Sequence, residues 1–238
     1  MPNTLPRKSN IEKRRRQALE SGDPEYQKRR NQLFNAAGEV FRKKGFDGAN
    51  MADFAQAVGI DRASIYYYVS GKEELFQKLV HRAVQENVKM AETIRAEALA
   101  PELKVKSFIV ELMKSYGRHF PYLYLYIQED MTRVSNKNSA WAREMKDLSD
   151  RFDSAMLAII EEGVASGVIG GNGLTPRMMG LAIIGMCNWS HRWYYPEGNL
   201  SAEEIGERFS QIALNGILAR GTDRPELPPN PWAGTGAF

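Results

Sequence analysis

A short segment between two glycines carries a dense group of side chains that can hydrogen-bond to, or stack on, another molecule. Between Gly59 and Gly71 the chain reads IDRASIYYYVS. Its guanidinium, hydroxyl and phenol groups suit contacts with the base edges and phosphates of a nucleic acid. The segment is therefore the first candidate for a functional surface.

Two short helices joined by a tight turn are expected to position these side chains. Phe54, Ala55 and Val58 indicate a first helix, and Gly59 ends it with a residue that tolerates unusual backbone angles. Asp61 can then cap a second short helix that runs to Tyr68. This arrangement is a helix-turn-helix, in which the N-terminal end of the second helix reaches base edges in the major groove.

The residues predicted to contact DNA lie on and around this second helix. Arg62 stands at its N-terminal end, where base contacts are made. Lys72 follows a glycine at the start of the next helix and is predicted to contact a phosphate through its side chain or its backbone amide. The complete predicted set is Asn50, Asp61, Arg62, Ala63, Ser64, Tyr66, Tyr67, Tyr68 and Lys72.

The stretch GFDGANMADFAQAVGIDRASIYYYVSGKEELF resembles the helix-turn-helix of the TetR family of regulators. The resemblance is specific over residues 27–76, and the helix plan extends it more loosely to residue 220. Asn50 replaces the usual threonine cap, and Tyr68-Val69 replaces the usual His-Phe. The resemblance implies a dimeric, ligand-responsive regulator that binds a palindromic DNA operator. It implies repression more often than activation, and both remain open.

The remaining sequence predicts an all-α protein of about nine helices. Apolar residues recur with helical spacing, as at Leu33, Ala36, Ala37, Val40 and Phe41, and no alternating strand pattern appears. Four regions are predicted: an arm over 1–26, a DNA-binding domain over 27–72, a ligand-binding and dimerisation domain over 73–220, and a Pro-rich disordered tail over 221–238.

The predicted N-terminal arm is basic. Nine Lys or Arg residues fall between Arg7 and Arg30, against four acids. Its prolines and its lack of apolar period indicate a flexible segment. Such an arm can raise DNA affinity by neutralising phosphates, but a charged run can also be merely solvated. Both interpretations remain open.

Aromatic and methionine residues are concentrated in the predicted C-terminal domain. They could line a pocket for a large apolar effector, although such residues can equally form a core. The predicted lining residues are Met113, Phe120, Tyr124, Gln128, Trp141, Met156, Met186, Trp189 and Trp193. The segment from Asn188 to Glu204 also looks like one found in family branches that respond to acyl-coenzyme A thioesters. Another large apolar metabolite or drug is the alternative.

The last predicted helix offers a face for dimerisation. Its apolar positions could pack with the helix that begins at Pro176 into a four-helix seam between two protomers. The predicted interface residues are Ile205, Phe209, Ile212 and Gly216.

Composition argues against other classes of protein. A single cysteine and three scattered histidines supply no local metal motif, and no phosphate-binding loop or catalytic constellation appears, so neither an enzyme nor a cofactor is expected. A helical adaptor would explain the body but not the surface around Arg62. No apolar run is long enough to span a membrane, and no signal peptide begins the chain, so the cytoplasm is expected.

Overall fold

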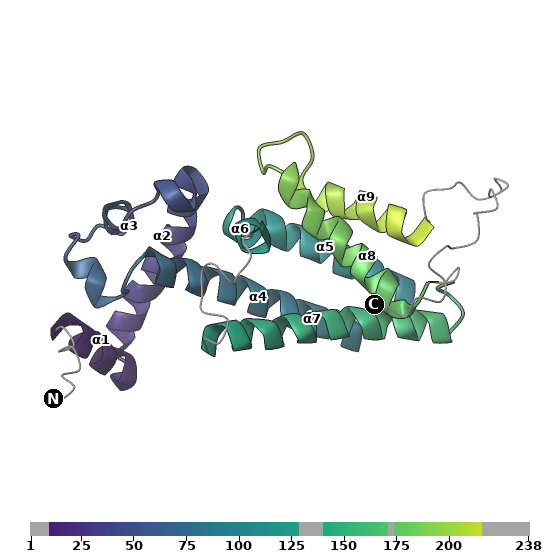
Figure 1. Ribbon diagram of the computed structural model, residues 1–238, viewed down its shortest axis with the longest axis horizontal. Helices are drawn as coiled ribbons and strands as arrows, with labels where there is room; N and C mark the ends of the chain where they lie inside the picture. The colour runs from purple at the N-terminus through teal and green to yellow at the C-terminus, as the bar shows by residue number, and fades with distance from the viewer. Residues whose placement is uncertain (1–9, 129–139, 171–173, 216–238) are drawn as a thin grey trace, which may run out of the picture.

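The computed structural model describes residues 10–128, 140–170 and 174–215, and throughout these ranges the chain is helical or loop, without strands. The prediction of an all-α fold is therefore confirmed. Figure 1 shows a small N-terminal unit joined through one long helix to a larger helical body. The elements are α1 Asn10–Ser21, α2 Pro24–Gly48, α3 Met51–Ala57, the 3₁₀ turn η1 Ser64–Tyr67, α4 Lys72–Ala96, α5 Pro101–Arg118, α6 Tyr122–Gln128, α7 Ala140–Ala165, α8 Pro176–Trp189, the 3₁₀ turn η2 Ser190–Arg192, and α9 Ala202–Asn215.

The N-terminal unit packs α2, α3 and η1 around a small aromatic core. Phe41, Phe54 and Ile65 are completely buried, one from each element. Gly45 has a positive φ of 69° and interrupts the helical geometry of α2, as its glycine predicts. The interruption lets Phe46 turn back to stack on Phe41, with ring centroids 5.8 Å apart.

Residues 10–21 form a helix, whereas the sequence analysis predicted a flexible arm over residues 1–26. The segment contains neither proline nor glycine and is rich in Glu, Lys, Arg and Gln, which favour helices. Ala18 is buried, and α1 lies against η1. The prediction gave weight to the surrounding prolines and missed this tertiary contact.

The body is built around α5. Helix α9 packs along α5, α7 packs along both α4 and α5, and α8 packs on α7. The approach of α9 to α5 depends on Gly206, because a Cβ there would lie 2.8 Å from Val110 Cα. Lys104 on α5 is buried and pairs with Glu162 on α7, with Nζ and Oε2 2.8 Å apart.

One predicted helix end differs clearly from the structure. The sequence pattern after Pro176 predicts a helix to about Tyr195, but α8 ends at Trp189 and η2 follows. The segment predicted to run to Val134 is described only as far as Gln128, and the Pro-rich tail lies outside the described residues. Among the helices described, none combines the length and the apolar character needed to cross a membrane.

Candidate nucleic-acid interface

Asp61 caps the start of η1, as predicted. Its carboxylate accepts hydrogen bonds from the backbone amides of Ala63 and Ser64, each at 2.9 Å, and a short one from the Ser64 hydroxyl. The bonds from Ser64 hold the pKa of Asp61 below its ordinary value. Arg62, Ala63 and Ser64 are all exposed. The capped end of η1 therefore presents a cation and a hydroxyl on a fixed backbone.

The recognition element is shorter than predicted. The sequence predicted a helix over residues 62–68, but only Ser64–Tyr67 is helical, with 3₁₀ geometry. Ile65 is completely buried, so the aromatic run is anchored on one side. Consecutive β-branched and aromatic residues favour helices weakly, and this contact rather than local propensity holds the turn.

Asn50 and Gly59 hold the preceding helix as predicted. The Asn50 side chain accepts bonds from the amides of Ala52 and Asp53, and the Asp53 carboxylate accepts one in return from the Asn50 amide. Gly59 has a φ of 69°. Asn50 is exposed, but its side chain is engaged in this capping box.

Two of the three predicted tyrosines pack against α2. The Tyr68 ring stacks on Tyr26 with centroids 5.3 Å apart, and the Tyr67 ring meets Tyr26 edge-on at 5.1 Å. The Tyr26 hydroxyl also donates to the Tyr67 carbonyl at 3.3 Å. Both rings are half-buried, so these contacts limit the ring surface that remains for a partner. Tyr26 was missed because its role depends on residues 41 positions away.

The Lys72 side chain points at backbone carbonyls. Its ammonium donates to the carbonyl of Phe46 at 3.0 Å, with longer bonds to those of Ala49 and Asp47, and lies 4.6 Å from the Phe46 ring centroid. It thus closes the C-terminal end of α2. Of the two predicted ways to contact a phosphate, the backbone amide at the start of α4 is the one not occupied by these bonds.

Glu74 joins three elements behind the recognition element. It accepts bonds from the Ser70 amide and hydroxyl at 2.8 and 2.7 Å, and pairs with Arg15 of α1 and Arg30 of α2 at 3.5 Å each. Burial alone would raise the pKa of Glu74, but the Ser70 bonds and the two arginines together lower it. The carboxylate therefore stays charged and ties α1 to the unit.

A groove separates α1 from the start of η1. One wall is formed by α1 and the other by the exposed end of η1. The lining residues are Ile11, Glu12, Arg15, Arg62, Ala63, Tyr66 and Ser70. The predicted DNA contacts Arg62, Ala63 and Tyr66 therefore lie beside a helix that the sequence analysis did not predict.

The predicted effector residues are divided between the interior and the surface. Met113 and Met156 are completely buried, and Tyr124 is nearly so. Trp189 and Trp193 are instead 61% and 47% exposed. Phe120 and Met186 are half-buried. Gln128 ends α6, and its side chain lies outside the described residues.

Polar groups lie among the buried aromatic side chains of the body. The Tyr124 and Ser190 hydroxyls are 2.7 Å apart, and the Tyr116 hydroxyl donates a short bond to the Asn188 amide oxygen. Burial raises the pKa of both tyrosines well above the ordinary value, so they stay neutral donors. Trp141 packs on the core, and its buried indole N–H has no hydrogen-bond partner among the described residues.

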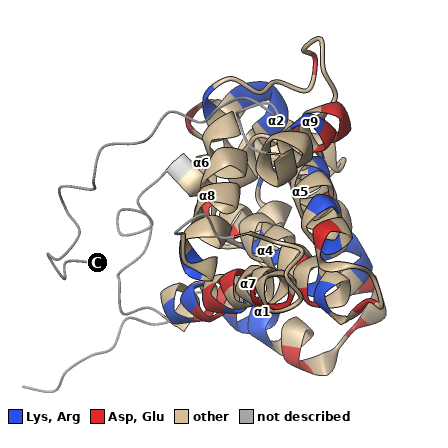
Figure 2. Ribbon diagram, turned by 90° about the vertical axis from the view of Figure 1, so that its right-hand side faces the viewer, with Lys and Arg blue, Asp and Glu red and all other residues tan. Residues whose placement is uncertain are grey.

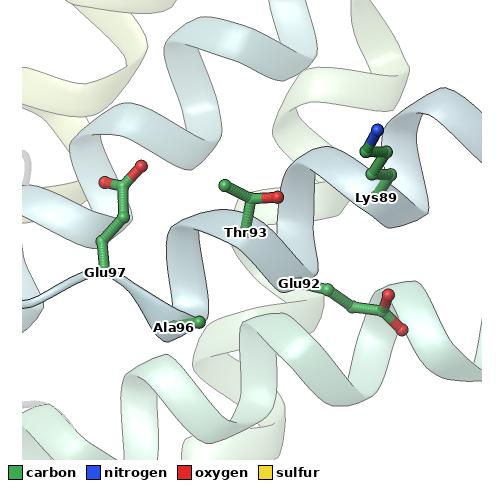
Figure 3. Close-up of a pocket in the computed structure, with 5 residues that line it drawn as sticks. All are labelled: Lys89, Glu92, Thr93, Ala96 and Glu97. Atoms are coloured by element: carbon green, nitrogen blue, oxygen red, sulfur yellow. The ribbon is translucent and has the colours of Figure 1, made fainter.

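A shallow hollow runs along the C-terminal half of α4 (Figure 3). Lys89, Thr93 and Glu97 point to one side, while Glu92 points toward the neighbouring helix. Glu92 is already paired with Arg151 of α7, with its carboxylate 2.8 Å from the guanidinium. The hollow is lined by α4 and its cap alone, so it lacks the walls that a binding site needs.

The predicted dimer residues also differ in position. Ile205 is 3% exposed and faces α5, whereas Ile212 is 47% exposed, and Phe209 packs edge-on against Trp193. Gly216 lies outside the described residues. Exposed apolar side chains nevertheless occur on α8, on α9 and directly after η2: Met178, Leu181, Trp189, Trp193, Ile212 and Leu214.

Comparison with known proteins agrees with this architecture. Residues 33–79 match the family described as "Bacterial regulatory proteins, tetR family", and residues 98–217 match "Tetracyclin repressor-like, C-terminal domain". The two matches cover the helix-turn-helix and most of the body. They confirm the family resemblance on which the functional prediction rested.

A sequence relative agrees with these matches, and two solved structures share the fold. The HTH-type transcriptional repressor KstR2 of Mycolicibacterium smegmatis is 24% identical over 200 residues, covering 82% of this chain and 94% of the relative. The TetR family regulator PfmR of Thermus thermophilus has a TM-score of 0.68 at 24% identity, covering 79% of this chain and 99% of PfmR. AibR, solved with isovaleryl coenzyme A and operator DNA, has a TM-score of 0.63 at 15% identity, covering 77% of this chain and 97% of AibR.

The capped recognition element, the helical body and both family matches lead to one assignment. Transcriptional regulators of this kind are not enzymes. The chain belongs to the TetR family and is a ligand-responsive, DNA-binding transcriptional regulator.

Proposed function

We propose that the protein is a homodimeric repressor that holds a palindromic operator through η1 of each protomer and releases it when a large apolar effector binds the body. The observation that carries the proposal is the Asp61-capped start of η1, where Arg62 and Ser64 are exposed on a fixed backbone. Arginine reads guanine through two hydrogen bonds in the major groove. Such a protein acts where the chromosome is, in the bacterial cytoplasm.

Dimerisation is supported by the exposed apolar side chains of α8 and α9. Leu181, Trp189 and Ile212 are each about half or more exposed, at 52%, 61% and 47%. Apolar area of this kind on two adjacent helices is costly to leave in water and suits a four-helix seam. A two-fold dimer would then present two η1 elements to successive major grooves, about 34–36 Å apart.

The effector site is proposed between α5, α6, α7 and α8. Met113 and Met156 supply deformable apolar walls. Tyr124 and the Trp141 indole, which has no partner within the described ranges, supply donors. An acyl-coenzyme A thioester is the favoured class of ligand, and the AibR complex supports it by showing such a ligand in this fold. A different apolar metabolite is the alternative.

Signal transfer is proposed to pass through α4 and α6. Helix α4 runs from η1 into the body, and α6 contacts both α4 and α2. At the α2 contact, a Cβ on Gly38 would lie 3.7 Å from the Tyr122 ring. An effector that favours another packing of α6 would shift α2 and α4, and DNA affinity would fall by its differential affinity for the two states.

Gel-shift titration tests the proposed DNA binding, with DNA fragments that flank the gene encoding this protein. The wild-type protein should bind a discrete fragment, and Arg62→Ala should weaken binding by about 1–3 kcal/mol. Lys146→Ala, which removes an exposed charge from α7, is the control and should bind as the wild type does. Unchanged affinity in the Arg62 variant would refute the assignment of η1.

Thermal unfolding tests the effector. A ligand that binds only the folded protein raises the melting temperature. Long-chain or steroid-derived acyl thioesters should do so and should release bound DNA, whereas coenzyme A alone should not. Stabilisation by small polar metabolites instead would refute the thioester class and leave the DNA-binding proposal intact.

A further inference from the structure

We propose that α1 is a fixed part of the DNA-binding surface and contacts the phosphate backbone outside each half-site. The inference rests on the proposed function, because it assumes that η1 enters a major groove. It adds a second DNA contact, made by a helix that neither family match includes, since the first of those matches begins at residue 33.

The orientation of α1 is fixed by its surroundings. Gly22, with a φ of 66°, makes the sharp turn between α1 and α2, and Asp23 caps α2. Ala18 is buried, and Arg15 reaches the Glu74 carboxylate that also holds Arg30 and Ser70. A helix held in this way loses less conformational entropy on binding than a flexible arm would.

The N-terminal half of α1 lies beside the end of η1 that reads DNA. Ile11 and Arg15 share a groove with Arg62 and Tyr66. A duplex engaged by Arg62 would therefore pass close to α1, whatever the exact angle of docking. Because α1 and the predicted DNA-contacting end of η1 line the same groove, DNA is favoured over a protein partner at α1.

Exposed residues of α1 carry the charge that such a contact needs. Lys13, Arg14 and Arg16 are consecutive or nearly so and all exposed. Arg16 is paired with Glu20 at 2.7 Å, whereas Lys13 and Arg14 make no ion pair among the described residues. Two cations per protomer are thus available for phosphates, and phosphate contacts add affinity without sequence preference.

The position of α1 indicates which part of the DNA it would touch. In both Figure 1 and Figure 2, α9 lies near the top and α1 near the bottom. A dimer formed through α8 and α9 would place the partner on the α9 side. Helix α1 then lies on the outer side of each DNA-binding unit, against DNA that flanks the palindrome.

The test compares duplexes of two lengths and two double variants in the full-length protein. The half-sites are first identified by selecting, from a random pool, the duplexes that the wild-type protein retains. The shorter duplex carries only these half-sites, and the longer one adds about six base pairs at each end, roughly half a helical turn. Lys13→Ala/Arg14→Ala removes the two cations and preserves helix propensity. Lys89→Ala/Lys146→Ala removes two exposed charges from the body as the control.

Wild-type and control proteins should bind the longer duplex at least about tenfold more tightly, and the α1 variant should lose this preference. The magnitude of its salt slope (log of the binding constant against log of the salt concentration) should also fall by about 3.6, since four cations per dimer are removed. Equal length preference in all three proteins would overturn the inference. If no duplex is retained from the pool at all, the proposed function itself fails, which is a separate outcome.

Discussion

The N-terminal unit and the helical body use polar side chains in opposite ways. In the N-terminal unit, the side chains of Asp61 and Asn50 accept hydrogen bonds from backbone amides, and Arg62, next to Asp61, is exposed. In the body, Tyr116, Tyr124 and Ser190 are buried and bonded to one another or to neighbours within the core. One region holds its backbone rigid to display side chains, and the other encloses them.

This difference separates two kinds of function. A surface that reads DNA needs a fixed backbone, because contacts with base edges tolerate little displacement. A body that responds to a ligand needs buried groups that can exchange one set of partners for another. Substitutions in the two regions should therefore affect different measurements.

The largest effect is expected from the exposed face of the body. Leu181→Glu/Ile212→Glu would place charges in the proposed seam, where desolvation is costly. Sedimentation should report a monomer, and operator affinity should fall by about 10² to 10⁴, because the second half-site is no longer tethered. Leu99→Glu/Leu103→Glu changes two other exposed leucines and should leave the dimer intact. A dimeric seam variant would locate the interface elsewhere.

The second largest effect is expected when either of two helix caps, one in each region, is removed. Asp61→Ala should destabilise η1 by about 1 kcal/mol, which corresponds to roughly fivefold weaker DNA binding. Thr175 caps α8 by accepting a bond from the Met178 amide, so Thr175→Ala should cost similar stability. The affinity of the Thr175 variant for a single half-site should nevertheless match that of the wild type. Equal losses of half-site affinity in both variants would show that the regions are not separable.

The smallest effect concerns His119, which lies at the end of α5. Burial lowers the pKa of His119, opposed by the Glu86 carboxylate 3.0 Å away, while Arg118 and Arg82 lower it further. A lowered pKa means that the unfolded chain binds the proton more readily. The stability contributed by the neutral ring is thus fully present above the unfolded pKa of about 6.5 and is lost as pH falls through the folded one.

Denaturant unfolding at several pH values between 8 and about 5 measures this loss, with His119→Gln as the reference that cannot titrate. The difference in unfolding free energy between wild type and variant should shrink as pH falls. A difference that grows toward acid would mean that the Glu86 interaction outweighs burial. In that case His119 would be charged in the folded protein.

Local signals predicted the N-terminal unit well. The glycine turn at Gly59 and the caps at Asn50 and Asp61 depend on residues within a few positions, and the structure contains all three. A cap of the same local kind occurs in the body at Ser201, whose hydroxyl accepts a bond from the Glu204 amide at 3.2 Å while its own amide donates to the Glu204 carboxylate. Caps and glycine turns can be predicted from neighbouring residues alone.

Features that depend on distant contacts were not predictable in this way. Helix α1 has helix-favouring residues of its own, but the contact that fixes its position joins Arg15 to Glu74, 59 residues away. Trp189, Trp193 and Tyr124 all lie in aromatic-rich stretches of the sequence, but helix packing leaves the two tryptophans exposed and buries the tyrosine. Aromatic density identified the region and could not assign each ring to a face.

Selection of random duplexes by full-length protein, followed by sequencing, tests the central claim most directly. The account predicts an inverted repeat whose half-site centres lie about one helical turn apart, and the Arg62→Ala protein should lose preference at one symmetric pair of positions. Retention of DNA with no enriched motif, or the same motif at the same strength with Arg62→Ala, would contradict the claim that η1 reads the operator.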